Sequence, residues 1–173
     1  MEKVEMNKDM KLSEHLASPS EAALSHLSEL NGLRLSPHFS LGELTKTNYV
    51  TKDGNFPSRV AIENLTNICE NWLEALRQAQ GPLIINSGYR SPEVNKLAGG
   101  APTSNHLTGC AVDIHVSGFE QAIRYASILL DISEGTQRDY DELFIEKNKT
   151  GSHWIHFAVK PKDNRRKSGF IKV

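Results

Sequence analysis

The chain has 173 residues, of which 38% are hydrophobic and 24% are charged, so one globular domain with a single core is the simplest expectation. Its 20 basic and 21 acidic residues leave a formal net charge of -1. Neither nucleic acid nor an anionic membrane is therefore expected as a partner, and no apolar run is long enough to span a bilayer.

The N-terminal part of the chain predicts helices and one loop. Residues 1–10 are polar and lack the apolar core of a signal peptide, so we expect the protein to be made and first held in the cytoplasm. Leucines at helical spacing predict a short helix over about 20–30. A helical turn over 39–44 and a loop over 45–56 are expected next.

The strongest helical pattern begins at Pro57, a residue suited to the first turn of a helix. Gly81-Pro82 ends it. Between these limits one apolar face repeats at steps of three and four, formed by Ala61, Leu65, Ile68, Trp72, Leu73 and Leu76. We expect this face to pack in the core.

The next segments predict strands mixed with helices. A β-branched stretch over 83–86 predicts a buried strand, and Ser91-Pro92 opens a short helix. Residues 102–109 are expected to form a loop that carries His106. The segment 110–116 alternates as a strand, with Ala111, Asp113 and His115 on one side.

A helix and a hairpin are expected in the last third of the chain. Ser117-Gly118-Phe119-Glu120 has the pattern of a capping box. The expected buried stripe of the helix consists of Phe119, Ile123, Ala126, Leu129 and Leu130. Residues 142–146 and 154–159 predict two strands of a hairpin.

Together these elements predict an α+β fold, with a mainly antiparallel sheet flanked by helices. The expected division is a leader with a short helix (1–38), a folded domain (39–160) and a basic tail (161–173). We expect the tail to be solvated, with contact to an anionic polymer as the alternative. Cys69 and Cys110 lack C-x-x-C spacing, so free thiols are favoured over a disulfide between them.

Two histidines and an aspartate are the candidate chemical centre. His106, Asp113 and His156 offer two nitrogens and one carboxylate, which is a ligand set for zinc with one position left open for water. The alternative is a loop histidine, a surface carboxylate and a histidine at the edge of the core, without a metal. Residue types alone do not decide between the two.

Three ordered motifs carry a family resemblance: Ser87-Gly88-Tyr89-Arg90, then Ser104-x-His106-x-x-Gly109-x-Ala111-x-Asp113, then Trp154-x-His156. This pattern of motifs, which spans roughly residues 39–159, resembles that of the zinc D-alanyl-D-alanine carboxypeptidase family. That family includes D-Ala-D-Ala dipeptidases and phage L-alanyl-D-glutamate endolysins, and the hedgehog signalling domain resembles it in fold.

The resemblance implies one Zn²⁺ per chain, held by His106, Asp113 and His156. It also implies that Arg90 holds the substrate and stabilises the oxyanion, a role that suits a guanidinium beside a reacting carbonyl, and that Ser104 lies near the substrate. Tyr89 is expected either to line the substrate groove or to pack in the core.

The general base is where the sequence departs from this pattern. Several relatives carry Glu or Asp three residues before the last zinc histidine, and here that position is His153. An imidazole can act as a base near neutral pH. In a regular strand, however, His153 and His156 would point to opposite faces. Glu146, at the end of the neighbouring strand, is the competing candidate.

The sequence therefore predicts a zinc metallopeptidase, a D,D-carboxypeptidase or an endolysin-type endopeptidase, that cleaves peptidoglycan stem peptides next to a D-amino acid. We expect a monomer that acts on the cell wall after release by phage-directed lysis, or on internalised wall fragments. The unusual base position favours an alternative, a non-enzymatic module of the same fold that binds wall peptide or protein. A zinc amidase with another acyl substrate is a third hypothesis.

Overall fold

The computed structural model describes residues 31–173, and the helix expected over 20–30 lies outside this range. Its helical elements are α2 (Leu41–Thr45), α3 (Arg59–Ile68), the π-helical turn η1 (Cys69–Leu73), α4 (Glu74–Gln80), α5 (Pro92–Leu97), the 3-10 turn η2 (Asn105–Thr108) and α6 (Phe119–Thr136). Its strands are β1 (Ile85–Ser87), β2 (Ala111–His115), β3 (Glu142–Lys147), β4 (His153–Ala158) and β5 (Lys167–Lys172). None of the helices in the described range is long and apolar enough to cross a membrane.

The strands form one sheet in the order β1-β2-β4-β3-β5. All neighbouring strands are antiparallel except β3 and β5, which are parallel. The expected α+β class with a mainly antiparallel sheet is thus confirmed. In the centre of the sheet, Asp113 of β2 is paired with His156 of β4, and His156 is paired with Phe144 of β3.

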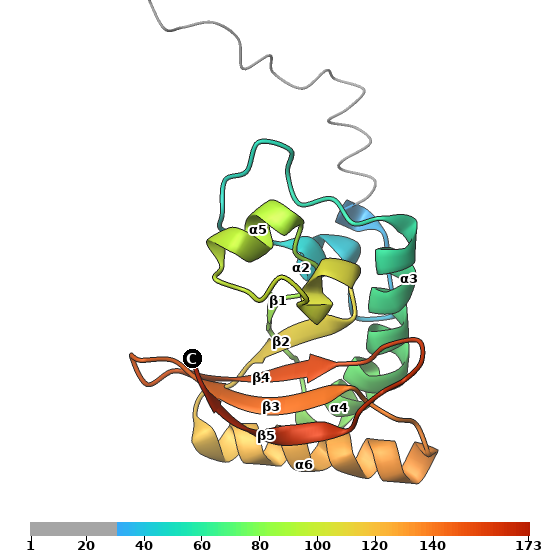
Figure 1. Ribbon diagram of the computed structural model, residues 1–173. Coiled ribbons are helices and arrows are strands. Elements are labelled where there is room, and N and C mark those ends of the chain that lie inside the picture. The colour runs from blue at the N-terminus through green and yellow to red at the C-terminus, as the bar shows by residue number, and fades with distance from the viewer. Residues whose placement is uncertain (1–30) are drawn as a thin grey trace, which may run out of the picture.

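Helices cover one face of this sheet. α6 runs along it, and the continuous rod of α3, η1 and α4 lies at its side (Figure 1). Trp72 of η1 packs on Phe157 of β4 with ring centroids 5.0 Å apart. The rod matches the helix predicted from 57 to 80, and the six residues of its predicted apolar face are all buried. The other face of the sheet looks toward the segment with α2, α5 and η2 (Figure 1).

The C-terminal residues are not the solvated tail that we expected. Lys167–Lys172 form β5, which adds a parallel edge strand beside β3. Before it, Arg165 bonds to the buried Asp141, and Arg166 forms an ion pair with Asp139. These two arginines thus have acidic partners within the fold, which the linear sequence does not reveal.

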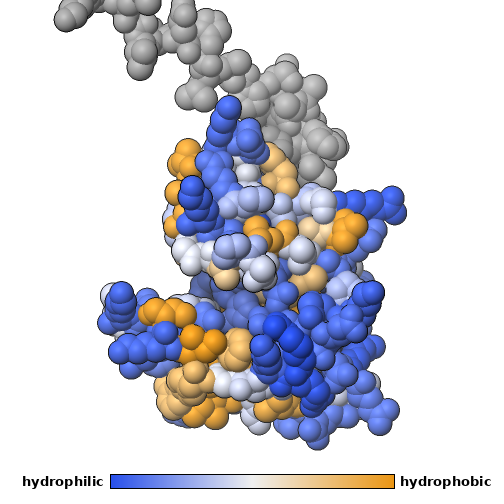
Figure 2. Space-filling model, viewed as in Figure 1, coloured by the Kyte–Doolittle hydropathy of each residue, from blue (hydrophilic) through white to orange (hydrophobic). Residues whose placement is uncertain are grey.

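The predicted packing of α6 is wrong in two respects. Its buried residues are Ala122, Tyr125, Leu129 and Ser133, whereas Phe119, Ile123 and Leu130 are 42%, 49% and 36% exposed. Gly118 is the N-cap residue, and no side chain donates or accepts a capping hydrogen bond there. The expected capping box does not form; instead, the Gln121 side chain accepts a hydrogen bond from the Ser117 backbone N–H. Figure 2 shows apolar side chains gathered where α6 begins, near the end of β5.

Both cysteines are buried and free. Burial raises the pKa of the Cys69 thiol and of the Cys110 thiol, which keeps both in the unreactive protonated form. The expectation of free thiols is confirmed, and neither thiol takes part in the candidate site.

Candidate metal centre

Three elements bring the predicted ligands together. His106 lies in η2, Asp113 in β2 and His156 in β4. One ligand atom of each lies within 4.8 Å of the others, and no second group of this kind occurs in residues 31–173. His106 and Asp113 are only 2% and 6% exposed. The fold therefore gathers two nitrogens and a carboxylate from distant parts of the chain at one point.

A short, tightly capped turn positions His106. The Ser104 side chain accepts from the His106 backbone N–H, and Gly109 ends η2 in the left-handed conformation. A side chain at Gly109 would place Cβ 2.3 Å from the Ala61 carbonyl oxygen, so this position requires glycine. η2 is thereby held against α3.

The tautomer of His106 follows from its second contact. Its Nδ1 lies 2.6 Å from the Gly88 carbonyl oxygen, which can only accept a hydrogen bond. Nδ1 therefore carries the proton, and Nε2, which lies 3.3 Å from Asp113 Oδ1, is free to bind a metal. A Cβ at Gly88 would lie 2.3 Å from the Leu44 carbonyl oxygen. The absence of a side chain at Gly88 lets the backbone approach close enough to orient His106.

The sheet register positions the other two ligands. Asp113 and His156 are directly paired across β2 and β4, so their side chains project from the same face. His156 Nδ1 lies 3.0 Å from Asp113 Oδ1. The second Asp113 oxygen accepts from Arg90, whose Nε donates to the Ser87 hydroxyl at 2.7 Å. Arg90 thus fixes the carboxylate from the side opposite the histidines.

The charges of the centre depend on one another. Burial acts to raise the pKa of Asp113, but the nearby His106 ring and the hydrogen bond from His156 hold it well below its usual range. For His156, burial acts to lower the pKa, yet hydrogen bonds to Asp113 and Glu142 raise it to about 9. A metal ligand must be the neutral imidazole. Metal binding at neutral pH therefore displaces a proton from His156.

The donor set fits zinc. Zn²⁺ is commonly bound by histidine nitrogens and a carboxylate, and a site with three protein ligands leaves a coordination position for water or substrate. The polar atoms of the ligands that face away from the centre have partners: Gly88 for His106, Arg90 for Asp113 and Glu142 for His156. Such partners orient metal ligands and fix their tautomers.

A groove of about 410 Å³ opens beside the centre. Its lining includes Arg90 and Asp113 together with Lys46, Tyr49, Asn86 and Trp154. Arg90 thus lies between the Asp113 carboxylate and an open space. Tyr89 is not part of this lining and is only 8% exposed, which favours its packing role. The Ser104 hydroxyl caps η2 and is likewise absent from the lining.

The structure separates the two candidates for the general base. β4 is regular from its first residue, where His153 pairs with Lys147, so His153 projects from the face opposite His156. Its ring lies 5.6 Å from that of Phe119 on α6. The prediction of His153 as the base is therefore wrong for this arrangement, for the geometric reason that strand alternation supplies.

Glu146 lies on the same face as the metal ligands. It pairs with Trp154, two residues from His156 along β4, and it is half-buried. Burial raises the pKa of its carboxyl group, partly offset by the charge of His156. A raised pKa brings a carboxylate closer to the range useful for proton transfer near neutral pH.

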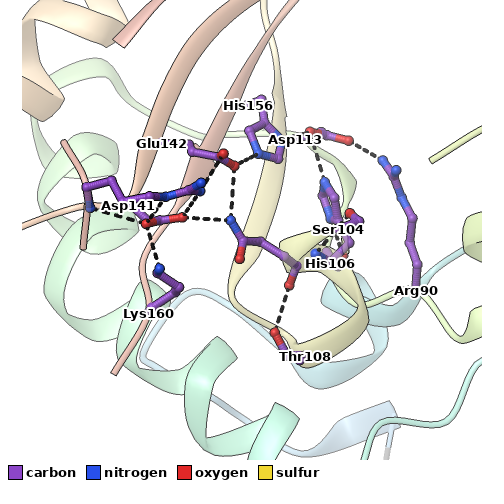
Figure 3. A network of polar contacts seen from close by, with 12 residues as sticks. Arg90, Ser104, His106, Thr108, Asp113, Asp141, Glu142, His156 and Lys160 are labelled. Atoms are coloured by element: carbon purple, nitrogen blue, oxygen red, sulfur yellow. Dashed lines mark hydrogen bonds and ion pairs between the residues drawn. The ribbon is translucent and has the colours of Figure 1, made fainter. Parts of the chain in front are cut away.

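Sequence reasoning missed Glu142. Its Oε2 lies 3.4 Å from His156 Nε2 and accepts from the Asn105 side chain at 3.0 Å. Figure 3 shows Glu142 between His156 and the Asp141 cluster. The one available signal was its period-two spacing from Glu146, which places both residues on one strand face.

Comparison with known proteins agrees with this geometry. Residues 37–141, more than half of the chain, match the peptidase M15 family. Over 80 residues the chain is 34% identical to the zinc D-Ala-D-Ala carboxypeptidase of Streptomyces albus G. This aligned segment covers 44% of the present chain and 31% of that protein. The chain thus spans about a third of the length of this relative. The resemblance expected from the motifs is confirmed: the chain belongs to the peptidase M15 family.

Proposed function

We propose that this protein is a zinc metallopeptidase that hydrolyses peptidoglycan stem peptides next to a D-amino acid, as a D,D-carboxypeptidase or an endopeptidase. The observation that carries the proposal is the convergence of His106, Asp113 and His156 beside an open groove. The M15 match supports peptidase activity. The name of the Streptomyces relative supports zinc and a D-amino acid substrate.

Arg90 is proposed to act on the substrate as well as on Asp113. When bound, zinc supplies a Lewis acid that polarises a carbonyl group and acidifies water. Attack on that carbonyl places negative charge on its oxygen, and a guanidinium stabilises such charge. Arg90 uses Nε for Ser87 and one Nη for Asp113. Its other Nη remains to donate to a substrate in the groove that it lines.

Glu146 is proposed as the group that takes a proton from the attacking water. It shares the face of the ligands and is shielded enough for burial to raise its carboxyl pKa. The protonated Glu146 carboxyl group would then act as a general acid and deliver the same proton to the leaving amine. The regular register of β3 and β4 keeps the Glu146 side chain on the face that carries the metal ligands.

Peptide carboxylates suit the charge of the groove. Lys46 and Arg90 are its cationic residues, and its one carboxylate, Asp113, is already bonded to Arg90 and the histidines. Within residues 31–173, Lys46 forms no ion pair and is exposed. Stem peptides carry free carboxylates, so they match a groove with an excess of positive charge.

Incubation with muropeptides tests the proposal. Zinc-loaded protein should release a fragment cleaved next to a D-residue, detected by mass spectrometry. A chelator should stop the cleavage, and added zinc should restore it. His106→Ala is the control, since it removes one ligand. Failure of the zinc-loaded wild-type protein to cleave any stem peptide would contradict the proposal.

A binding module on the same fold is the second candidate. The orientation of His153 away from the centre favours it, because the position that serves as the base in several relatives does not face the groove here. The muropeptide experiment separates the two. Binding of intact peptide without chelator-sensitive cleavage is the result expected of a module.

A further inference from the structure

A polar network links Glu142 to both histidine ligands. On one side, Glu142 Oε2 faces His156 Nε2 at 3.4 Å. The same oxygen accepts a 3.0 Å hydrogen bond from the side chain of Asn105, the residue that precedes His106 in η2. A single carboxylate oxygen therefore contacts one ligand directly and the turn that carries another ligand (Figure 3).

Residues near the C-terminus hold this carboxylate from behind. Arg165 donates to Glu142 Oε1 at 2.6 Å and to both oxygens of Asp141. Asp141 is fully buried, and it also forms an ion pair with Lys160 and accepts from Asn105. With Oε1 engaged by Arg165, Oε2 is the oxygen left to face His156. The segment that we expected to be a free tail thus fixes the rotation of the Glu142 carboxylate.

Glu142 is not itself one of the clustered ligands. Among the described residues, the group whose ligand atoms come within 4.8 Å of one another contains only His106, Asp113 and His156. Glu142 faces Nε2 of His156, whereas Nδ1 faces Asp113. The carboxylate and the metal position therefore lie on opposite edges of the same imidazole ring.

We propose that Glu142 is a positioning residue for the metal centre, and that Arg165 is its support. Glu142 accepts a hydrogen bond from the N–H at His156 Nε2, which leaves the lone pair on Nδ1 directed at the metal position. Partners of this kind make the imidazole a better ligand and hold its orientation. The inference rests on the metal centre of the proposed function, but it concerns metal affinity and not peptide cleavage.

Zinc affinity of the whole chain, measured by competition with a chromophoric chelator, tests the role of Glu142. Glu142→Ala should weaken zinc binding by roughly 10–100-fold, the usual effect of losing such a partner. Glu142→Gln should lose less, because the amide oxygen still accepts from Nε2. Imidazole ¹⁵N spectra of the zinc-loaded protein should show protonated Nε2 for His156 in the wild type and altered signals in Glu142→Ala.

Arg165 and Arg166 provide a matched pair of variants. They are neighbours with side chains 43% and 42% exposed. Arg166 contacts Ser133 and Asp139, not Glu142. Arg165→Ala should weaken zinc binding several-fold, whereas Arg166→Ala should leave it unchanged. The thermal midpoints of the metal-free variants identify any loss of folding.

The outcomes separate this inference from the proposed function. A wild-type protein that binds no zinc would contradict the proposed function and, with it, the inference. Wild-type zinc binding that is unchanged in folded Glu142→Ala, with unchanged His156 signals, would overturn the inference alone. Equal weakening by Arg165→Ala and Arg166→Ala would assign the effect to general loss of charge and would also overturn the role of Arg165.

Discussion

The two faces of the central sheet differ sharply although they are built from the same strands. Toward the helices, Val112, Ile114, Ile155 and Phe157 are fully buried. On the opposite face, alternate positions of β2, β4 and the neighbouring β3 carry Asp113, His156, Trp154 and Glu146. Strand alternation therefore places a hydrophobic contact and a chemical group one residue apart.

Within a single strand, the residues on one face therefore stabilise the fold, and the residues on the other face form the candidate site. The apolar face gains free energy by removing hydrocarbon from water. The polar face instead confines Asp113 and two histidines, whose charges must be balanced by Arg90 and Glu142. Substitutions on the apolar face should therefore lower the free energy of unfolding, whereas substitutions on the polar face should reduce metal binding or turnover.

The largest effect is expected at His156. His156→Ala removes one of the three proposed ligands, so zinc binding should be lost. Hydrolysis of the proposed stem-peptide substrate should fall by about 10³-fold or more, since a catalytic metal supplies several kcal/mol of transition-state stabilisation. The metal-free variant should still unfold cooperatively in urea. Elemental analysis and circular dichroism measure the two properties. Loss of folding as large as that of a core variant would contradict the division between the faces.

Glu146 should affect turnover without affecting the metal. Glu146→Gln keeps the shape but cannot accept a proton, so kcat should fall by about 10²–10⁴-fold, the usual contribution of general base catalysis. Zinc content should equal that of the wild type. An unchanged kcat would remove Glu146 from the mechanism and return attention to groups that reach the groove from other elements.

Ile155 tests the apolar face. Ile155→Ala empties a fully buried position next to His156, and we expect a loss of about 2–5 kcal/mol in the free energy of unfolding. Denaturant titration measures this loss. At temperatures where the variant remains folded, it should bind zinc with the stoichiometry of the wild type, because its side chain points away from the ligands. Loss of zinc by a folded variant would show that the faces are coupled.

Acid should act on the charged end of the sheet. Burial acts to raise the pKa of Asp141, but hydrogen bonds from Arg165, Lys160 and Asn105 hold it far below its usual range. A depressed folded-state pKa stabilises the fold above the unfolded pKa of about 4, and this stabilisation is lost as the pH falls below that value. Asp141→Asn should therefore flatten the decline of stability below pH 4. Asp139→Asn, at an exposed carboxylate, serves as the control.

The sequence predicted much of the fold, because the strands and the long helix follow from local patterns, and the motifs of the family resemblance named the three residues that the fold brings together. The alternation around Asp113 and the helical face through Trp72 were read correctly. The α6 stripe was not, since Tyr125 and Ser133 are buried while Phe119 and Ile123 remain exposed. Which face of an amphipathic helix is covered depends on what packs against it, and that information is not local.

Long-range pairing explains the other failures. β5 is mostly exposed and rich in lysine, so its composition resembles that of a solvated tail; it is a strand because β3 offers a free edge. Glu142 lies beside His156 because of the register between β3 and β4, and Arg165, 23 residues later in the chain, holds its carboxylate. No spacing rule within one segment predicts such contacts.

The smallest effect is expected at His153, and it is the most informative about the base. His153 packs beside Phe119, which in turn lies 4.9 Å from Phe170 by ring centroids. His153→Ala should therefore change kcat/KM less than about threefold and the free energy of unfolding by less than about 1 kcal/mol, as for other partly exposed positions. His153→Phe keeps the aromatic contact and controls for packing. A fall in kcat as large as that of Glu146→Gln, in both His153 variants, would mean that the imidazole reaches the groove during turnover. The start of β4 would then have to leave its regular register, and the sequence position shared with relatives would outweigh the strand geometry.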